Sequence, residues 1–170
     1  MTDERSRWCK WIWASTALAM ETVTNDLDIP LLVEGIDTRQ PENIRASHAE
    51  LRLNGPFYYE ISKDCYQLQM PINILLVDYM TGDEEDAYRM QEWAGIFQSI
   101  MDKPIAIYRY GQDTEDDGSF LECLRVKRTR DGGVRIIHFG QVGRTGTVDT
   151  TIRETAIDGL FEMYLKPTRN

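Results

Sequence analysis

The sequence has few of the residues that build disulfide, metal or catalytic centres. It contains three cysteines and two histidines among 170 residues. Cys9, Cys65 and Cys123 lie far apart and are odd in number, so their spacing fits neither a zinc knuckle nor a closed set of disulfides. We expect three reduced, mostly buried thiols in a protein made in the cytoplasm. The alternative is a cross-link between subunits that forms only after release from the cell.

The sequence also lacks a long apolar run. No stretch approaches the roughly 18 consecutive apolar residues that a membrane-spanning helix needs. The first residues, Met1-Thr-Asp-Glu-Arg, show no apolar core followed by a small-residue cleavage site. The sequence therefore predicts neither a membrane span nor a signal peptide.

Positive charge is in short supply. The chain has 19 Lys and Arg against 28 Asp and Glu, a net charge of −9 with both histidines neutral. This charge repels phosphate at long range, which argues against a general nucleic-acid binder or a ligand of acidic membranes. The hydrophobic fraction of 42% argues against disorder. A chain of 170 residues has the usual size of one domain, so we expect a single domain over 1–170.

Residues of about 5–23 are predicted to form a helix that is apolar on more than one side. At about 100° per residue, Trp8 and Trp11 lie together while Trp13 points roughly 140° away from Trp8. Such a helix must be covered on more than one side. Either its own core surrounds it, or one face packs on its own sheet and the other on a neighbouring subunit. Since Trp is a frequent interface anchor, all three tryptophans are candidate interface residues.

The middle of the chain alternates polar and apolar residues with the period of β-strands. A short strand is expected after Pro30, and a polar loop over 37–47 follows it. Alternation over 48–61 and again over 66–76, with a plausible turn between them, predicts an extended antiparallel hairpin over about 48–78.

A second helix is predicted over about 83–102. Thr81 and Glu84 have the spacing of a capping box, and acidic residues follow at the positive end of the helix dipole. Apolar residues at helical spacing form one stripe, which suits a helix lying on a sheet. These residues are Met90, Trp93, Ala94, Phe97, Ile100 and Met101.

The remainder, about 104–165, is predicted to be β-structure. Residues 120–128 and 134–139 are expected to form a second hairpin, and 141–151 a connection rich in Gly and Thr. In the last segment the residues from Ile157 to Leu165 alternate between two faces. The whole predicts an α+β fold, in which an N-terminal helix and a central helix pack on a mainly antiparallel sheet with a long hairpin.

The sequence contains no recognisable catalytic, cofactor or metal pattern. His48 and His138 belong to no ligand motif, and neither acidic cluster has the spacing of a calcium loop. The glycines Gly140, Gly143 and Gly146 precede no Lys-Ser/Thr that would bind phosphate. We therefore expect a protein that is not an enzyme and that needs no cofactor or metal.

Charge is unevenly distributed along the chain. The segment 120–139 is locally basic, whereas the segments 83–86 and 113–117 are acidic. Opposite charges on different parts of one domain suit head-to-tail association of identical copies. The alternative is that the basic residues only protect an edge strand. The candidate interface residues are Arg125, Lys127, Arg128 and Arg130 on the basic side and Asp113, Glu115, Asp116 and Asp117 on the acidic side.

The order and size of these elements resemble the tail terminator, or tail completion, proteins of tailed bacteriophages. The run from His48 to Leu53 followed by the run from Tyr66 to Val77 is similar to their central hairpin. The segment 85–101 resembles the helix packed on that hairpin, and Gly159 to Leu165 resembles the final strand.

The resemblance implies a non-enzymatic virion protein, assembled in the host cytoplasm, that forms a homo-oligomeric ring, usually a hexamer, at the head-proximal end of the tail. Its implied partners are other copies of itself, the tail tube protein, neck or connector proteins and, in a contractile tail, the sheath protein. No membrane and no specific nucleic acid is among them. One alternative is another neck, connector or minor tail subunit. Two hypotheses from other functional classes are a small-ligand-binding domain and a hydrolase that uses the acidic loops.

Overall fold

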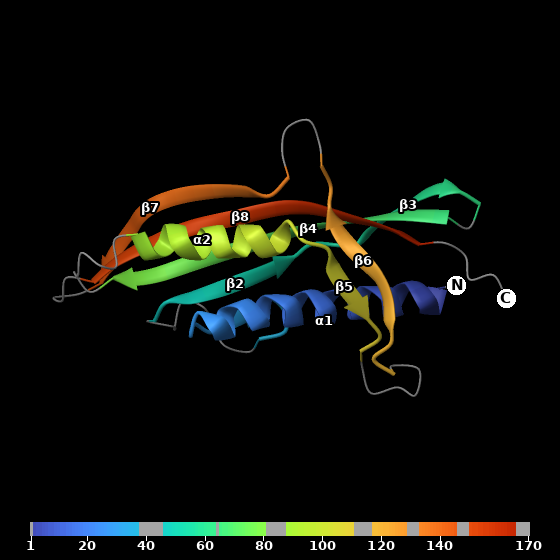
Figure 1. The fold of residues 1–170 in the computed structure, drawn as a ribbon, viewed down its shortest axis with the longest axis horizontal. Helices are drawn as coiled ribbons and strands as arrows, with labels where there is room; N and C mark the ends of the chain where they lie inside the picture. The colour runs from blue at the N-terminus through green and yellow to red at the C-terminus, as the bar shows by residue number, and fades with distance from the viewer. Residues whose placement is uncertain are drawn as a thin grey trace.

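Within the residues that it describes, the computed structural model has two helices and a curled sheet (Figure 1). It describes residues 2–37, 46–63, 65–80, 88–110, 117–128, 133–145 and 150–165. In chain order the elements are α1 (Thr2–Asp26), β1 (Leu31–Val33), β2 (His48–Leu53), β3 (Phe57–Ser62), β4 (Cys65–Met80), α2 (Arg89–Met101), β5 (Ile105–Tyr108), β6 (Phe120–Val126), β7 (Arg135–Thr145) and β8 (Thr150–Leu165).

The centre of the sheet is the antiparallel pair β4 and β8, which are joined from Tyr66 opposite Leu165 to Met80 opposite Thr151. The strand order is β1-β2-β4-β8-β6-β5, with β3 also pairing with β4 and β7 also pairing with β8. β1 runs parallel to β2, and the other pairings of the described strands are antiparallel. The predicted α+β class with a mainly antiparallel sheet is therefore confirmed.

Both helices cover the same face of this sheet. Alternate residues of β4, from Leu68 to Leu76, are almost fully buried and belong to one apolar core with residues of α1 and α2. The same alternation holds on β8, where Ile157, Phe161 and Met163 are buried. In Figure 1, α2 runs along β8 and β4 while α1 lies beside β2 and β5. No described helix covers the opposite face of the sheet, which is called the helix-free face below.

The predicted hairpin over 48–78 is present but interrupted. β2 and β3 both pair with the same edge of β4, β2 with its second half and β3 with its first. Between them Gly55 adopts a φ of +103°, a conformation that favours glycine, and a cis peptide bond precedes Pro56. The alternating pattern therefore continues through a break in the backbone ladder.

The second predicted hairpin is wrong. β6 pairs with β5 and, through Arg125 and Val126, with β8, whereas β7 pairs with β8. With 16 residues, β8 is long enough to hold β6 and β7 one after the other along one edge. The connection predicted over 141–151 is also wrong in part, because β7 continues to Thr145 and β8 begins at Thr150.

The helices differ from their predicted bounds at their ends. α1 runs from Thr2 to Asp26 and so exceeds 5–23. α2 begins at Arg89 after Tyr88, whose side chain makes no capping hydrogen bond; Thr81 and Glu84 lie outside the described residues. The predicted apolar stripe is confirmed, with only Ile100 half-buried and the other members buried.

Candidate functional site

The three tryptophans of α1 occupy different environments. Trp11 is 5% exposed and lies in the subunit's own core, where its ring meets that of Trp8 edge to face at 5.6 Å between centroids. Trp13 is half-buried, and its Nε1 donates a hydrogen bond to the Gly55 carbonyl oxygen at 3.3 Å. Trp8 is half-buried as well, so Trp8 and Trp13 keep apolar surface that a neighbour could cover.

The basic candidates lie at and just after the end of β6. Arg125 and Arg128 are exposed. Lys127 is half-buried and forms an ion pair with Glu162 of β8, at 3.8 Å between Nζ and Oε2. This contact assigns Lys127 a role within the subunit and leaves Arg125 and Arg128 as the basic side chains offered to solvent. Arg130 lies outside the described residues.

Of the acidic candidates the structure describes only Asp117. Its carboxylate accepts a hydrogen bond from the Ser119 backbone N–H at 3.0 Å. Hydrogen bonds from Ser119 hold the pKa of this exposed carboxyl below its ordinary value. Asp113, Glu115 and Asp116 lie outside the described residues, so the predicted meeting of acidic and basic surfaces stays a prediction.

An apolar patch that sequence reasoning missed lies on β3 and the end of β8. Phe57, Tyr59 and Ile61 are 49%, 50% and 54% exposed, and Tyr164 is 47% exposed. On β4, Gln69 pairs with Phe57 of β3, and Gln67 pairs with Tyr59 of β3 on one side and with Tyr164 of β8 on the other. Paired residues share a face, so the rings of Phe57, Tyr59 and Tyr164 all lie on the helix-free face. The sequence pattern that indicates this patch is the presence of apolar residues on both faces of 57–61, because a strand buried on one face needs them on that face only.

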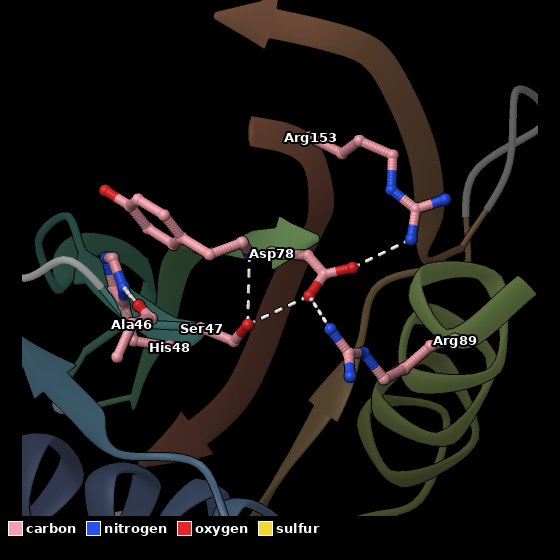
Figure 2. A network of polar contacts seen from close by, with 7 residues as sticks. Ala46, Ser47, His48, Asp78, Arg89 and Arg153 are labelled. Carbon is pink, nitrogen blue, oxygen red and sulfur yellow. Dashed lines mark hydrogen bonds and ion pairs between the residues drawn. The ribbon is translucent and has the colours of Figure 1, made fainter. Parts of the chain in front are cut away.

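A buried carboxylate organises the other end of the sheet (Figure 2). Asp78 of β4 is fully buried and accepts hydrogen bonds from three donors: Ser47 Oγ at 2.9 Å, Arg89 at 2.5 Å and Arg153 at 2.8 Å. Ser47 Oγ also accepts a bond from the backbone N–H of Tyr79. The cluster thus ties α2 and β8 to β4. Burial raises the pKa of Asp78, but the bonds from Arg153, Arg89 and Ser47 outweigh that effect and hold the pKa below its ordinary value.

A second polar group lies on the helix-free face at the start of β2. His48 is 2% exposed, and its ring contacts the Ala46 carbonyl at 2.7 Å and Glu50 Oε1 at 3.3 Å. Glu50 also accepts a bond from Arg52 at 2.8 Å. Desolvation lowers the pKa of His48, but the bonds to Glu50 and Ala46 and the charges of Glu50 and Glu154 raise it more, so the net shift is upward. The bond from His48 holds the pKa of Glu50 down against the opposing effect of burial.

The contacts of Asp78 join three elements, whereas those of His48 and Glu50 run along β2 and the residues just before it. Within the described ranges, no three His, Cys, Asp or Glu side chains gather in a way that could hold a metal ion. Cys9, Cys65 and Cys123 are free and half-buried, which corrects the expectation of mostly buried thiols. No helix in the described part of the chain is long and apolar enough to cross a membrane.

Comparison with known proteins adds little to this picture. No family model matches the chain, and no curated protein matches it. Among solved structures, one similar chain is 12% identical, covering 86% of this chain and 94% of its own length with a TM-score of 0.44. The name of that chain describes no activity, and a likeness at this level carries no argument about function.

Proposed function

We propose that this protein is a structural, non-enzymatic subunit of a tailed-bacteriophage virion. It forms a homo-oligomeric ring, a hexamer in the family that its sequence resembles, at the head-proximal end of the tail. The ring ends the tail tube and offers the surface to which the head is joined. Its partners are other copies of itself, the tail tube protein and the neck or connector proteins, with the sheath protein added in a contractile tail.

One observation carries this proposal: apolar side chains are exposed along two different sheet edges. β3 flanks β4 and bears Phe57, Tyr59 and Ile61. β7 flanks β8 on the opposite side and bears Ile137 and Phe139, which are 39% and 54% exposed. An exposed edge with apolar side chains invites pairing with another chain. Two different surfaces on opposite flanks meet the requirement of head-to-tail association, which closes into a ring when the rotation between copies permits.

The proposal is tested by measuring the mass of the purified protein by multi-angle light scattering over a range of concentrations. We expect a discrete oligomer that appears as a ring in negative-stain electron microscopy and binds the ends of isolated tail tubes. A strictly monomeric protein that forms no ring and has no affinity for tubes contradicts the proposal. Binding to connector rings without binding to tubes would instead assign the subunit to another place in the neck.

A further inference from the structure

We propose that strand β3 of one copy pairs with strand β7 of the next, so that the sheets of neighbouring subunits join edge to edge. This inference rests on the proposed function, because it names the surfaces through which the ring would close. The occupant of the β3 edge is therefore a second copy of this chain.

The lengths of the free edges select these two strands. The strand order leaves β1, β3, β5 and β7 with an edge that pairs with no other described strand. β1 has 3 residues and β5 has 4, and α1 packs against both. β3 has 6 residues and β7 has 11, although the ladder between β7 and β8 shifts register between His138 and Gly140 and again between Gln141 and Gly143. A longer edge offers more backbone donors and acceptors to an added strand, so β3 and β7 are the edges best able to extend the sheet.

The apolar side chains of the two edges lie on the same face. Phe57 and Tyr59 are on the helix-free face, as established by their pairing with Gln69 and Gln67. Ile137 pairs with Ala156, which pairs with Leu75, so Ile137 also lies on the helix-free face. In a continuous sheet, residues directly opposite one another share a face. Joining β3 to β7 therefore brings the two apolar rows together and covers both in one contact.

The two edges carry few charged residues. Within Phe57–Ser62 the charged residue is Glu60, and it is exposed. Within 135–140 the ionisable residues are Arg135 and His138, both exposed, and there is no acid. Pairing β3 with a second β3 would place two copies of Glu60 near each other and would leave Ile137 and Phe139 uncovered. Pairing β3 with β7 places Glu60 on the same face as His138, because Glu60 pairs with Tyr66 and His138 with Thr155, whereas Arg135 lies on the helix-free face.

The requirement that the apolar side chains share a face also limits the register between β3 of one copy and β7 of the next. An antiparallel pair with Tyr59 opposite Ile137 places Glu60 diagonal to His138 and brings Phe57 toward Phe139, which lies where the ladder between β7 and β8 is irregular. Shifting by two residues, so that Ile61 faces Ile137, brings Lys63 opposite Arg135, and like charges directly opposite are unfavourable. The first register is the one we propose.

The experiment uses single cysteines introduced into a variant of the full chain in which Cys9, Cys65 and Cys123 are changed to Ser. Directly opposite residues of an antiparallel pair have Cβ atoms about 4.5–5.5 Å apart, close to the spacing that a disulfide requires. Mixing Tyr59→Cys with Ile137→Cys under mild oxidation should give a covalent dimer on a non-reducing gel, and each variant alone should not. The chain that carries both substitutions should give a ladder that ends at the size of the ring.

Leu18→Cys is the matched control, because Leu18 is similarly exposed at 48% but lies on α1. A Tyr59→Cys and Ile137→Cys mixture that cross-links no more than the Leu18→Cys and Ile137→Cys mixture overturns the proposal. So does efficient cross-linking of Tyr59→Cys with itself, which indicates a two-fold contact between β3 strands. If rings still form in electron microscopy, the proposed function survives while this assignment of surfaces fails.

A second measurement does not depend on the cysteine-free background. In the otherwise unchanged chain, Tyr59→Asp and Ile137→Asp should each weaken association at least about tenfold, as expected for central residues of an interface. Leu18→Asp should leave association unchanged. Circular dichroism confirms that all three remain folded. Equal association of Tyr59→Asp and the original chain overturns the proposal.

Discussion

At the scale of single residues, the most consequential side chain is Asp78. It is a fully buried carboxylate between two arginines that come from α2 and β8, two elements distant in sequence. A buried charge without a partner is costly, while this one has three donors. Asp78 thus fixes how the start of α2 sits on the sheet.

We expect Asp78→Asn to lower the free energy of unfolding by about 3–5 kcal/mol, because the neutral amide leaves Arg89 and Arg153 without their shared counter-charge. Urea unfolding followed by circular dichroism measures the change. Ser47→Ala removes one neutral donor from the same carboxylate and should cost about 1 kcal/mol. A loss no larger in Asp78→Asn than in Ser47→Ala would contradict the assigned role of the cluster.

The His48 and Glu50 pair makes stability depend on pH. The pKa of His48 is raised above its ordinary 6.5, so its contribution is complete below pH 6.5 and is lost as the pH rises through the raised pKa. The pKa of Glu50 is lowered from its ordinary 4.5, so its contribution is complete above pH 4.5 and is lost as the pH falls through the lowered pKa. The pair should therefore stabilise the fold most between pH 4.5 and 6.5.

This dependence is checked by the difference in unfolding free energy between the original chain and a His48→Gln/Glu50→Gln variant, measured from pH 4 to pH 8. The difference should be largest inside the window and shrink on both sides. A difference that is constant with pH would show that the pair does not titrate with folding.

At the scale of elements, packing beneath α2 uses the absence of a side chain at Gly159 of β8. A Cβ built there would lie 2.7 Å from Cε2 of Phe161 and 3.4 Å from Cε of Met101, both fully buried residues. Glycine at this position therefore leaves room for the ring of Phe161 on the same strand, and the end of the Met101 side chain from α2 packs beside it.

Gly159→Ala should therefore lower the free energy of unfolding by about 1–3 kcal/mol through overpacking. Gly95→Ala is the matched control, since Gly95 is an exposed residue of α2 with nothing within 4 Å of an added Cβ. That change should stabilise the helix by roughly 0.5–1 kcal/mol. Opposite signs in thermal or urea unfolding are the expected result, and the same sign for both would contradict it.

The elements also show what sequence periodicity can and cannot reveal. The alternation on β4 and β8 and the stripe on α2 predicted the buried residues, because each reflects one face against one core. The partners of β6 and β7 were not predictable in this way. Both have the pattern of strands joined by a turn, but β7 pairs along β8, whereas β6 pairs with β5 and reaches β8 only through Arg125 and Val126. Strand pairing depends on which of several possible partner strands wins, and the alternating pattern of one sequence does not indicate the winner.

The candidate site was predictable only in part for a related reason. The tryptophans were identified as large apolar groups, but their spacing could not distinguish Trp11 in the core from Trp13 at the surface. The exposure of Phe57 and Tyr59 depends on β3 extending along β4 with no described strand on its other side. Asp78 is an acid in an apolar strand, but one of its two arginines, Arg153, lies 75 positions away in the sequence.

At the scale of the whole molecule, the net charge of −9 coexists with exposed basic side chains near the end of β6. Copies of an acidic protein repel one another at long range, so association requires local complementarity. Arg125 and Arg128 are placed to supply it, because they are exposed, whereas Lys127 is held by Glu162.

If the proposed ring forms, reversing both residues, Arg125→Glu and Arg128→Glu, should weaken its association while leaving the unfolding free energy within about 0.5 kcal/mol. The deficit should be largest at low ionic strength and diminish toward 1 M salt, where screening acts over about 3 Å. Sedimentation velocity at several salt concentrations measures it. Association that responds to neither reversal nor salt would mean that the basic residues only protect the strand end.

The long pairing between β4 and β8 also means that β4 is synthesised well before its neighbour β8. About 70 residues separate the end of β4 from the start of β8, which at roughly 5–20 residues per second takes the ribosome about 4–14 s. During that interval the apolar strand β4 has β2 and β3 on one edge but no neighbour on the other. Nascent chains are then open to mispairing with one another, and slower production or a chaperone that shields exposed strands should raise the soluble yield.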